Sequence, residues 1–152
     1  MCGIAGVLEL TRQRHVDPRV ITSMCDAIAR RGPDDAGYHV QENVGIGMRR
    51  LSIIDVAGGR QPITNEDGTL TIVFNGEIFN YAPLQTELKR RGHRFKTHGD
   101  TETILHLFEE EGPACLRHLR GMFAIAIWNE RTRSLFIARD RLGIKPLYPL
   151  QV

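Results

Sequence analysis

The chain begins with MCGIAGVLEL (residues 1–10), which places a cysteine directly before an apolar run. Ile4–Leu10 is short and almost wholly apolar, and a run of this kind predicts a buried strand. Gly3 and Gly6 leave room for another group to approach the backbone of this strand. The opening residues therefore predict a sheet whose first strand holds the cysteine at one end.

Helices and neighbouring strands are expected along the rest of the chain. A first helix is predicted to begin with Asp17 as its N-cap and Pro18 as its first residue, and to end at 30–33. Its apolar face is expected to comprise Val20, Ile21, Met24 and Ile28. Further helices are expected at 81–91 and 101–110, and strands at 37–40, 44–48, 70–74, 122–128 and 135–138, with a long loop at 54–68. Such a mixture of adjacent strands and separate helices predicts an α+β fold.

The composition is that of a globular protein and excludes several classes. With 152 residues, of which 41% are hydrophobic and 25% charged, the chain is not disordered as a whole. A net charge of +2 is too balanced for a protein that binds nucleic acid mainly by charge, and no apolar stretch is long enough to cross a membrane. We read no signal peptide, and three cysteines form neither a disulfide framework nor a zinc motif, so we expect a reducing, cytoplasmic location.

No repeat, low-complexity tract or linker divides the chain, so residues 1–152 are expected to form one domain. The segment Lys145–Leu150 resembles the entry to another strand, and the chain ends two residues later. We therefore expect the fold to be incomplete at its C-terminus.

Cys2 is a candidate nucleophile because of its position. If Met1 is removed, one residue carries both a thiol and a free α-amine, and an α-amine titrates near ~7.7–8.0, close to working pH. One residue can then supply both nucleophile and base, an arrangement that several hydrolases use. The alternative is a small, inert apolar residue at the start of a strand. Cys25 and Cys115 are expected to serve packing only.

Four further residues have chemistry that would suit an acyl-transfer site, and each has a structural alternative. Asn75 and Gly76 follow an apolar strand and could donate to an oxyanion, but Asn-Gly is also a strong hairpin signal. Arg50 could bind a carboxylate, or it could be an exposed strand-end arginine. Asp100 could bind an ammonium group or act as a helix N-cap, and the two roles are compatible.

The histidines and the Arg-Arg pairs give little indication of function. The histidines are scattered, and the one ligand-like pair, His93 and His98, is expected to flank a strand, so no metal is assigned. The Arg-Arg pairs at 30–31, 49–50 and 90–91 are expected to lie on solvated faces.

Taken in order, these motifs resemble a known family. The chain contains Met-Cys-Gly-Ile-Ala-Gly (1–6), Arg-Arg-Gly-Pro-Asp (30–34), Arg-Leu-Ser-Ile-Ile-Asp (50–55), Gln-Pro (61–62), Asn-Gly-Glu-Ile-Phe-Asn-Tyr (75–81), Gly-Asp-Thr-Glu (99–102), Gly-Met-Phe-Ala (121–124) and Arg-Asp-Arg-Leu-Gly-Ile-Lys-Pro-Leu-Tyr (139–148). Nearly the whole chain resembles the class II glutamine amidotransferase domain of glutamine-hydrolysing asparagine synthetases. The resemblance implies the Ntn-hydrolase fold, an αββα sandwich of two antiparallel sheets.

The resemblance also implies roles for individual residues. Cys2 would attack glutamine, and Asn75 and Gly76 would form the oxyanion hole. The substrate would be bound through its carboxylate by Arg50 and through its amino group by Asp100 with help from Glu77. The backbone of Leu51, Ser52, Ile53 and Ile54 would line the pocket.

The implied reaction is hydrolysis of glutamine to glutamate and ammonia through a thioester. In the family, ammonia reaches a synthetase domain of the same chain that uses ATP and Mg²⁺ to make asparagine from aspartate. The Ser-Gly-Gly-x-Asp-Ser loop of that domain is absent from these 152 residues, so no cofactor is expected here. The resemblance leaves open a homodimer of the full-length protein, a related amidotransferase with another acceptor, and a truncated remnant without activity.

Overall fold

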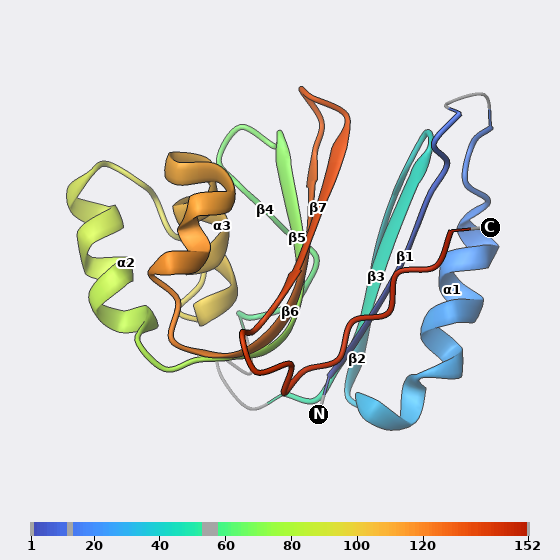
Figure 1. Cartoon of the computed structure of the whole chain (residues 1–152), viewed down its shortest axis with the longest axis horizontal. Helices are drawn as coiled ribbons and strands as arrows, with labels where there is room; N and C mark the ends of the chain where they lie inside the picture. The colour runs from blue at the N-terminus through green and yellow to red at the C-terminus, as the bar shows by residue number, and fades with distance from the viewer. Residues whose placement is uncertain (1, 12–13, 53–57, 152) are drawn as a thin grey trace.

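Two antiparallel sheets face each other in the middle of the molecule (Figure 1). The computed structural model describes residues 2–11, 14–52 and 58–151. The first sheet has the order β1-β3-β2, with β1 at Gly3–Leu8, β2 at Asp35–Gln41 and β3 at Val44–Arg50. The second has the order β4-β5-β6-β7, with β4 at Ile63–Thr64, β5 at Leu70–Ile78, β6 at Gly121–Asn129 and β7 at Ser134–Arg139.

Helices cover the outer face of each sheet. Helix α1 (Pro18–Ala27) packs on the first sheet, while α2 (Tyr81–Arg90) and α3 (Asp100–Glu111) lie on the far side of the second (Figure 1). Asp17 caps α1 as predicted, since its carboxylate accepts from the amide of Arg19 at 2.9 Å. Short 3₁₀ turns follow α1 at Ala29–Arg31 and α3 at Gly112–Arg117. The layers run helix, sheet, sheet, helix, which confirms the predicted αββα sandwich.

The two faces of the second sheet contribute to different parts of the core. Ile72, Phe74 and Ile78 of β5 pack against the helices, whereas Val73 packs between the sheets with residues of β3 and β6. Side chains of a strand alternate between its faces, so Asn75 shares the inter-sheet face with Val73. That face lies opposite the strand that begins next to Cys2.

The apolar face predicted for α1 is wrong in part. Val20 and Met24 are 45% and 38% exposed, whereas Ile21 and Cys25 are fully buried. A Cβ atom built on Gly45 or Gly47 of β3 would lie 2.4 Å from Ile21 and 2.8 Å from Cys25, respectively. Because α1 approaches β3 over these two glycines, only a narrow stripe of the helix is buried.

Three predictions about less regular segments are also wrong. Lys145–Leu150 forms no strand, and Tyr148 and Leu150 are each 87% exposed. No strand lies between His93 and His98, and the expected loop at 54–68 contains β4. Of these segments, only 54–68 contributes a strand to a sheet, through the pairing of β4 with β5.

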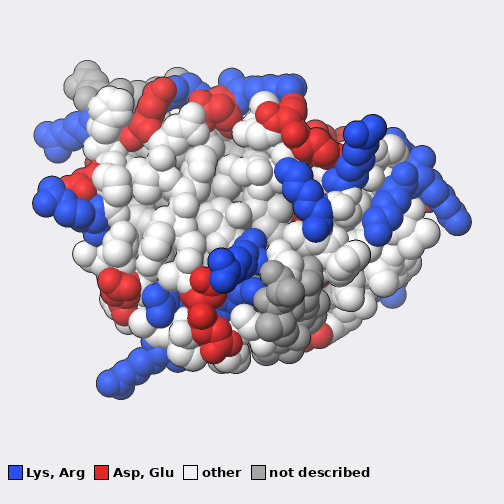
Figure 2. All heavy atoms as spheres, turned by 180° about the vertical axis from the view of Figure 1, so that it is seen from behind, with Lys and Arg blue, Asp and Glu red and all other residues white. Residues whose placement is uncertain are grey.

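The charge on the surface and the length of the helices agree with what the composition predicts. Acidic and basic side chains both surround a broad uncharged area on the face shown in Figure 2. Among the described residues, no helix is long and apolar enough to cross a membrane.

Candidate active site

A cavity of about 120 Å³ lies where the two sheets meet α3. Sites for drug-sized ligands are commonly about 300–1,000 Å³, so this one suits a smaller molecule. Its walls include seven of the residues singled out from the sequence: Cys2, Arg50, Leu51, Asn75, Gly76, Glu77 and Asp100. The fold thus brings together the residue that precedes β1, the end of β3, the end of β5 and the start of α3.

Cys2 is fixed at the cavity wall. Its Sγ accepts a hydrogen bond from the Leu51 amide at 3.3 Å and lies 3.6 Å from the Leu51 carbonyl oxygen. The guanidinium of Arg31 donates to the Cys2 carbonyl at 3.2 Å. A half-buried thiol that accepts from a backbone amide and borders a cavity differs from an inert core cysteine.

The other two cysteines are inert, as predicted. Cys25 and Cys115 are fully buried. Burial raises the pKa of Cys25 to about 11 and that of Cys115 to about 12. Thiols with such raised pKa values are neutral near pH 7, and a neutral thiol is a poor nucleophile.

The Arg-Gly-Pro-Asp motif holds the end of β3 beside Cys2. A Cβ on Gly32 would lie 2.3 Å from the Arg49 carbonyl carbon, so only glycine allows this approach. The Asp34 amide donates to the Arg50 carbonyl at 3.0 Å, and the Asp34 carboxylate accepts from the Ser52 amide at 2.8 Å. The motif therefore positions the backbone of 50–52, against which the thiol rests.

Asn75 and Gly76 lie within β5, so the hairpin-turn alternative is wrong. Gly76 is the register partner of Phe123, and β5 continues to Ile78 opposite Gly121. A Cβ on Gly76 would lie 2.1 Å from the carbonyl oxygen of Met122 on β6, which explains the glycine. Asn75 is 5% exposed, and no described residue forms a hydrogen bond with its side chain.

The Gly76 amide faces an open stretch of the sheet edge. Alternate amides of a strand point the same way, so it lies in one row with the amides of Phe74 and Ile78. The Phe74 amide donates to Gln61 Oε1 at 2.7 Å, and the Ile78 amide donates to Asp100 Oδ2 at 3.0 Å. Strand β4 pairs only with Thr71 and Ile72. Among the described residues none accepts from the Gly76 amide, so it is a donor directed at the cavity.

Opposite charges line the remaining walls. Arg50 is 5% exposed, which overturns the alternative of an exposed arginine. Asp100 is also 5% exposed and is the first residue of α3, whose N-cap is Gly99, so the N-cap alternative is wrong as well. Burial raises the pKa of Asp100, and the nearby charge of Glu77 acts in the same direction. A buried cation and a pair of carboxyl groups suit a zwitterion.

The prediction that the Arg-Arg pairs lie on solvated faces holds at 90–91, where the side chains are 75% and 44% exposed, and at Arg30, which is also exposed. Arg31 holds Cys2, Arg50 is buried, and the side chain of Arg49 is 18% exposed and donates to the Gly32 carbonyl at 3.2 Å. Spacing in the sequence did not distinguish these cases. Ile53 and Ile54, also expected in the pocket, lie outside the described residues.

Two cavity residues were not assigned a role from the sequence. Gln61 accepts from the Phe74 amide and donates from Nε2 to Thr101 Oγ1 at 3.2 Å, so it links β5 to α3. Lys145 is 5% exposed and adds a second cation to the lining. The Gln-Pro and Arg-Asp-Arg-Leu-Gly-Ile-Lys motifs marked both positions but did not show what they contact.

Asp140 builds the loop that delivers Lys145 to the cavity. It is 4% exposed, and its carboxylate accepts four backbone amides at 2.9–3.1 Å, from Phe123, Leu142, Ile144 and Lys145. Burial opposes ionisation, but these hydrogen bonds outweigh it and lower the pKa of Asp140 below the ordinary 3.8.

Replacing Asp140 by asparagine is expected to lower the free energy of unfolding at pH 7 by about 2–4 kcal/mol, because an amide cannot accept all four bonds. The stabilisation by a carboxylate of lowered pKa is present above the unfolded value of about 3.9 and is lost as the pH falls through the folded value. Urea unfolding should therefore show a difference in the free energy of unfolding between the parent and Asp140→Asn that is smaller at pH 3 than at pH 7. Equal stabilities at pH 7 would contradict this role.

Comparison with known proteins identifies the family of the chain. Residues 1–151 match the family described as a glutamine amidotransferase domain. The chain is 46% identical over 150 residues to asparagine synthetase [glutamine-hydrolyzing] 2 of Bacillus subtilis, covering 97% of this chain and 20% of that protein. It is 40% identical over 148 residues to asparagine synthetase [glutamine-hydrolyzing] 3 of Arabidopsis thaliana, covering 97% of this chain and 25% of that protein.

A solved structure shows the same fold. Glutamine phosphoribosylpyrophosphate amidotransferase from B. subtilis superposes with a TM-score of 0.72 at 19% identity, covering 92% of this chain and 37% of that one. The chain spans about a fifth to a quarter of the length of the curated relatives that it matches. Because the family model matches nearly the whole chain, the chain belongs to the glutamine amidotransferase domain family.

Proposed function

We propose that the chain hydrolyses glutamine to glutamate and ammonia, with Cys2 as an N-terminal nucleophile. The observation that carries the proposal is the shared cavity of Cys2, the Asn75-Gly76 donors and the charged pair Arg50 and Asp100. These are the components that nucleophilic attack on the amide of an amino acid requires.

The first step uses both groups of Cys2. Once Met1 has been removed, the α-amine takes the thiol proton, directly or through one water, and Sγ attacks the side-chain carboxamide carbon of glutamine. The C=O π electrons move to oxygen and form a tetrahedral oxyanion. The Asn75 amide and the Gly76 N–H donate to this oxygen.

The second step releases ammonia and then glutamate. The protonated α-amine gives its proton to the leaving nitrogen, the C–N bond breaks, and a γ-glutamyl thioester remains on Cys2. Water adds to the thioester with the amine again acting as base, and the C–S bond breaks to restore the thiol. The sum is glutamine plus water to glutamate plus ammonia.

Arg50 and Asp100 place the substrate. The guanidinium of Arg50 binds the α-carboxylate, and the carboxylate of Asp100, assisted by Glu77, binds the α-ammonium. The backbone of Leu51 borders the same cavity, and Ser52 is held beside it by Asp34. Binding both α-groups fixes how far the carboxamide reaches toward Cys2.

Replacing Asp100 by asparagine is expected to raise the KM for glutamine about 30-fold or more with a smaller change in kcat, because loss of one partner from a buried charge pair costs about 2–5 kcal/mol. The parent should discriminate against a glutamine analogue without the α-amino group, and the variant should not. Asp26→Asn, at a carboxylate that is 62% exposed, serves as the matched control. Unchanged discrimination in Asp100→Asn would contradict the assignment.

The same residue predicts a pH effect. Because burial raises the pKa of Asp100, its carboxyl group takes up a proton at a higher pH than an ordinary aspartate, and the protonated form does not attract the ammonium. In the parent, kcat/KM should fall as the pH decreases through this raised pKa, whereas Asp100→Asn should lack that acidic limb.

We further propose that the ammonia serves asparagine synthesis in a longer cytoplasmic protein. The identity of 40–46% to asparagine synthetases over 97% of the chain favours aspartate as the acceptor over the acceptor of the more distant structural relative. ATP and Mg²⁺ would act in the synthetase region and not in this domain. The full-length protein with glutamine, aspartate and ATP should yield asparagine, and amidation of another acceptor instead would exclude this part of the proposal.

The glutaminase proposal is tested by measuring glutamate and ammonia release from glutamine by the purified protein, with asparagine as the control substrate. Asparagine is one methylene shorter, so with its α-groups bound its carboxamide falls short of Cys2 by about 1 Å, which costs roughly 100-fold in rate. Release of glutamate and ammonia in equal amounts supports the proposal. A folded protein with its N-terminal Cys2 exposed but without glutamine hydrolysis would refute it.

A further inference from the structure

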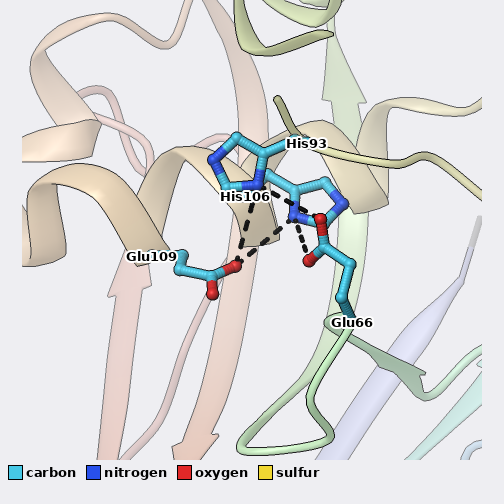
Figure 3. A group of neighbouring side chains, drawn as sticks. All are labelled: Glu66, His93, His106 and Glu109. Atoms are coloured by element: carbon cyan, nitrogen blue, oxygen red, sulfur yellow. Dashed lines mark ion pairs between the residues drawn. The ribbon is translucent and has the colours of Figure 1, made fainter. Parts of the chain in front are cut away.

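Four side chains outside the active site point toward one another (Figure 3). Glu66 comes from the turn between β4 and β5, His93 from the segment that follows α2, and His106 and Glu109 from α3. One ligand atom of each lies within 4.8 Å of those of the other three. From this group we infer a structural site for a divalent metal ion that prefers imidazole and carboxylate ligands, of which Zn²⁺ is the natural candidate.

The distances fit a tetrahedral ion. Bonds of about 2.0–2.1 Å to nitrogen and oxygen place neighbouring ligand atoms about 3.3–3.4 Å apart. His106 Nδ1 lies 3.2 Å from Glu66 Oε2 and 3.5 Å from Glu109 Oε2. His93 Nδ1 lies 3.4 Å from Glu66 Oε1 and 3.9 Å from Glu109 Oε2. Small side-chain movements would bring all four atoms to bonding distance of one ion.

His106 supplies an independent observation. The residue is completely buried, and neither ring nitrogen has a hydrogen bond to any part of the chain that the structure describes. The contacts of Nδ1 with the two carboxylates are close but lack hydrogen-bond geometry. A buried imidazole whose ring nitrogens form no hydrogen bond is costly, and a metal ion between Nδ1 and the carboxylates would satisfy Nδ1.

The surrounding groups orient the ligands as in metal sites. His93 Nε2 lies 3.1 Å from Glu110 Oε1, and His106 Nε2 lies 3.6 Å from the buried Glu102, so each imidazole has a carboxylate behind it. Glu66 Oε1 accepts from the Arg94 amide at 3.0 Å. Glu109 Oε1 accepts from Asn65 Nδ2 at 3.1 Å. Each ligand is therefore already held by a second contact.

The ion would join three segments that are far apart in the sequence. It would bind the β4–β5 turn and the segment after α2 to α3, whose first residue, Asp100, lines the active-site cavity. Glu66 and Glu109 have side chains that are 34% and 32% exposed, so an ion can enter from solvent. The site would stabilise the helix layer and would take no part in chemistry at Cys2.

The test measures zinc binding in a Cys2→Ala background without a histidine tag, since an N-terminal cysteine itself chelates metal. Buried Cys25 and Cys115 do not compete because their pKa values are raised. After removal of metal with a chelator, we expect one Zn²⁺ per chain by elemental analysis. We also expect a rise in Tm of about 5–10 °C when free Zn²⁺ exceeds Kd about 100-fold.

Variants separate this site from other binding. His93→Gln and Glu109→Gln, both at partly exposed positions, should weaken Zn²⁺ binding by about 100-fold or more in a chelator competition assay. His118→Gln is the matched control, because His118 also pairs with a glutamate, Glu111, at 2.8 Å but lies outside the group. His106→Gln should abolish binding, and the other two variants keep the test decisive if it does not fold. A folded parent that binds no stoichiometric Zn²⁺, or variants that bind as tightly as His118→Gln, would overturn the site.

Discussion

Cys2→Ala is expected to lower the rate of glutamine hydrolysis by at least about 10⁴-fold, because removing a nucleophile leaves only binding and oxyanion stabilisation. The variant should still fold and bind glutamine, since Arg50 and Asp100 are untouched. Glutamate release is measured together with a glutamine-dependent rise in Tm. The substitution thus separates chemistry from binding.

Cys25→Ala is the matched control for this experiment. Its thiol is buried between α1 and β3, so the substitution should lower stability modestly and leave the glutaminase rate within a few-fold of the parent. Comparable glutamate release by Cys2→Ala and the parent would show that another group attacks the substrate.

Asn75→Ala is expected to lower kcat by about 10²–10³-fold with little change in KM, because the lost donor interacts with the oxygen only when it carries negative charge. The side chain forms no hydrogen bond with a described residue, so the Tm should change little. Asn75→Asp keeps the shape but presents an acceptor to the oxyanion, and it should be at least as slow. A rise in KM without a fall in kcat would place Asn75 in substrate binding instead.

Local sequence signals predicted the local features of the fold. Asp17 and Pro18 set the start of α1 through one cap bond and a fixed φ, so no distant residue is needed to predict it. The strands expected at 122–128 and 135–138 were likewise predicted from neighbouring residues, and they are found as β6 and β7, which pair with each other.

Features that depend on distant contacts were predicted poorly. Asn75-Gly76 favours a turn by itself, but pairing with β6, more than forty residues later, keeps it in a strand. Exposure of Val20 and Met24 depends on two glycines in β3. The four residues of the proposed metal site come from three segments whose spacing matches no known metal-binding motif. The sequence alone therefore did not reveal the site.

The candidate active-site residues could be recognised only from the ordered set of motifs and not from any one residue. Cys2, Arg50, Asn75 and Asp100 each had a plausible structural role, and their chemistry followed only from the resemblance of the whole ordered set. The fold places all four around one cavity because β1, β3, β5 and α3 converge there. Arg31, Gln61 and Asp140 hold that arrangement through backbone contacts that residue type alone does not indicate.

The most direct measurement is rapid acid quenching of the protein during glutamine turnover, followed by mass spectrometry of its N-terminal peptide. We predict that Met1 is absent and that the peptide beginning at Cys2 carries a γ-glutamyl group as a thioester on its sulfur. Turnover by a protein that keeps Met1, or with the acyl group on any other residue, would contradict the account.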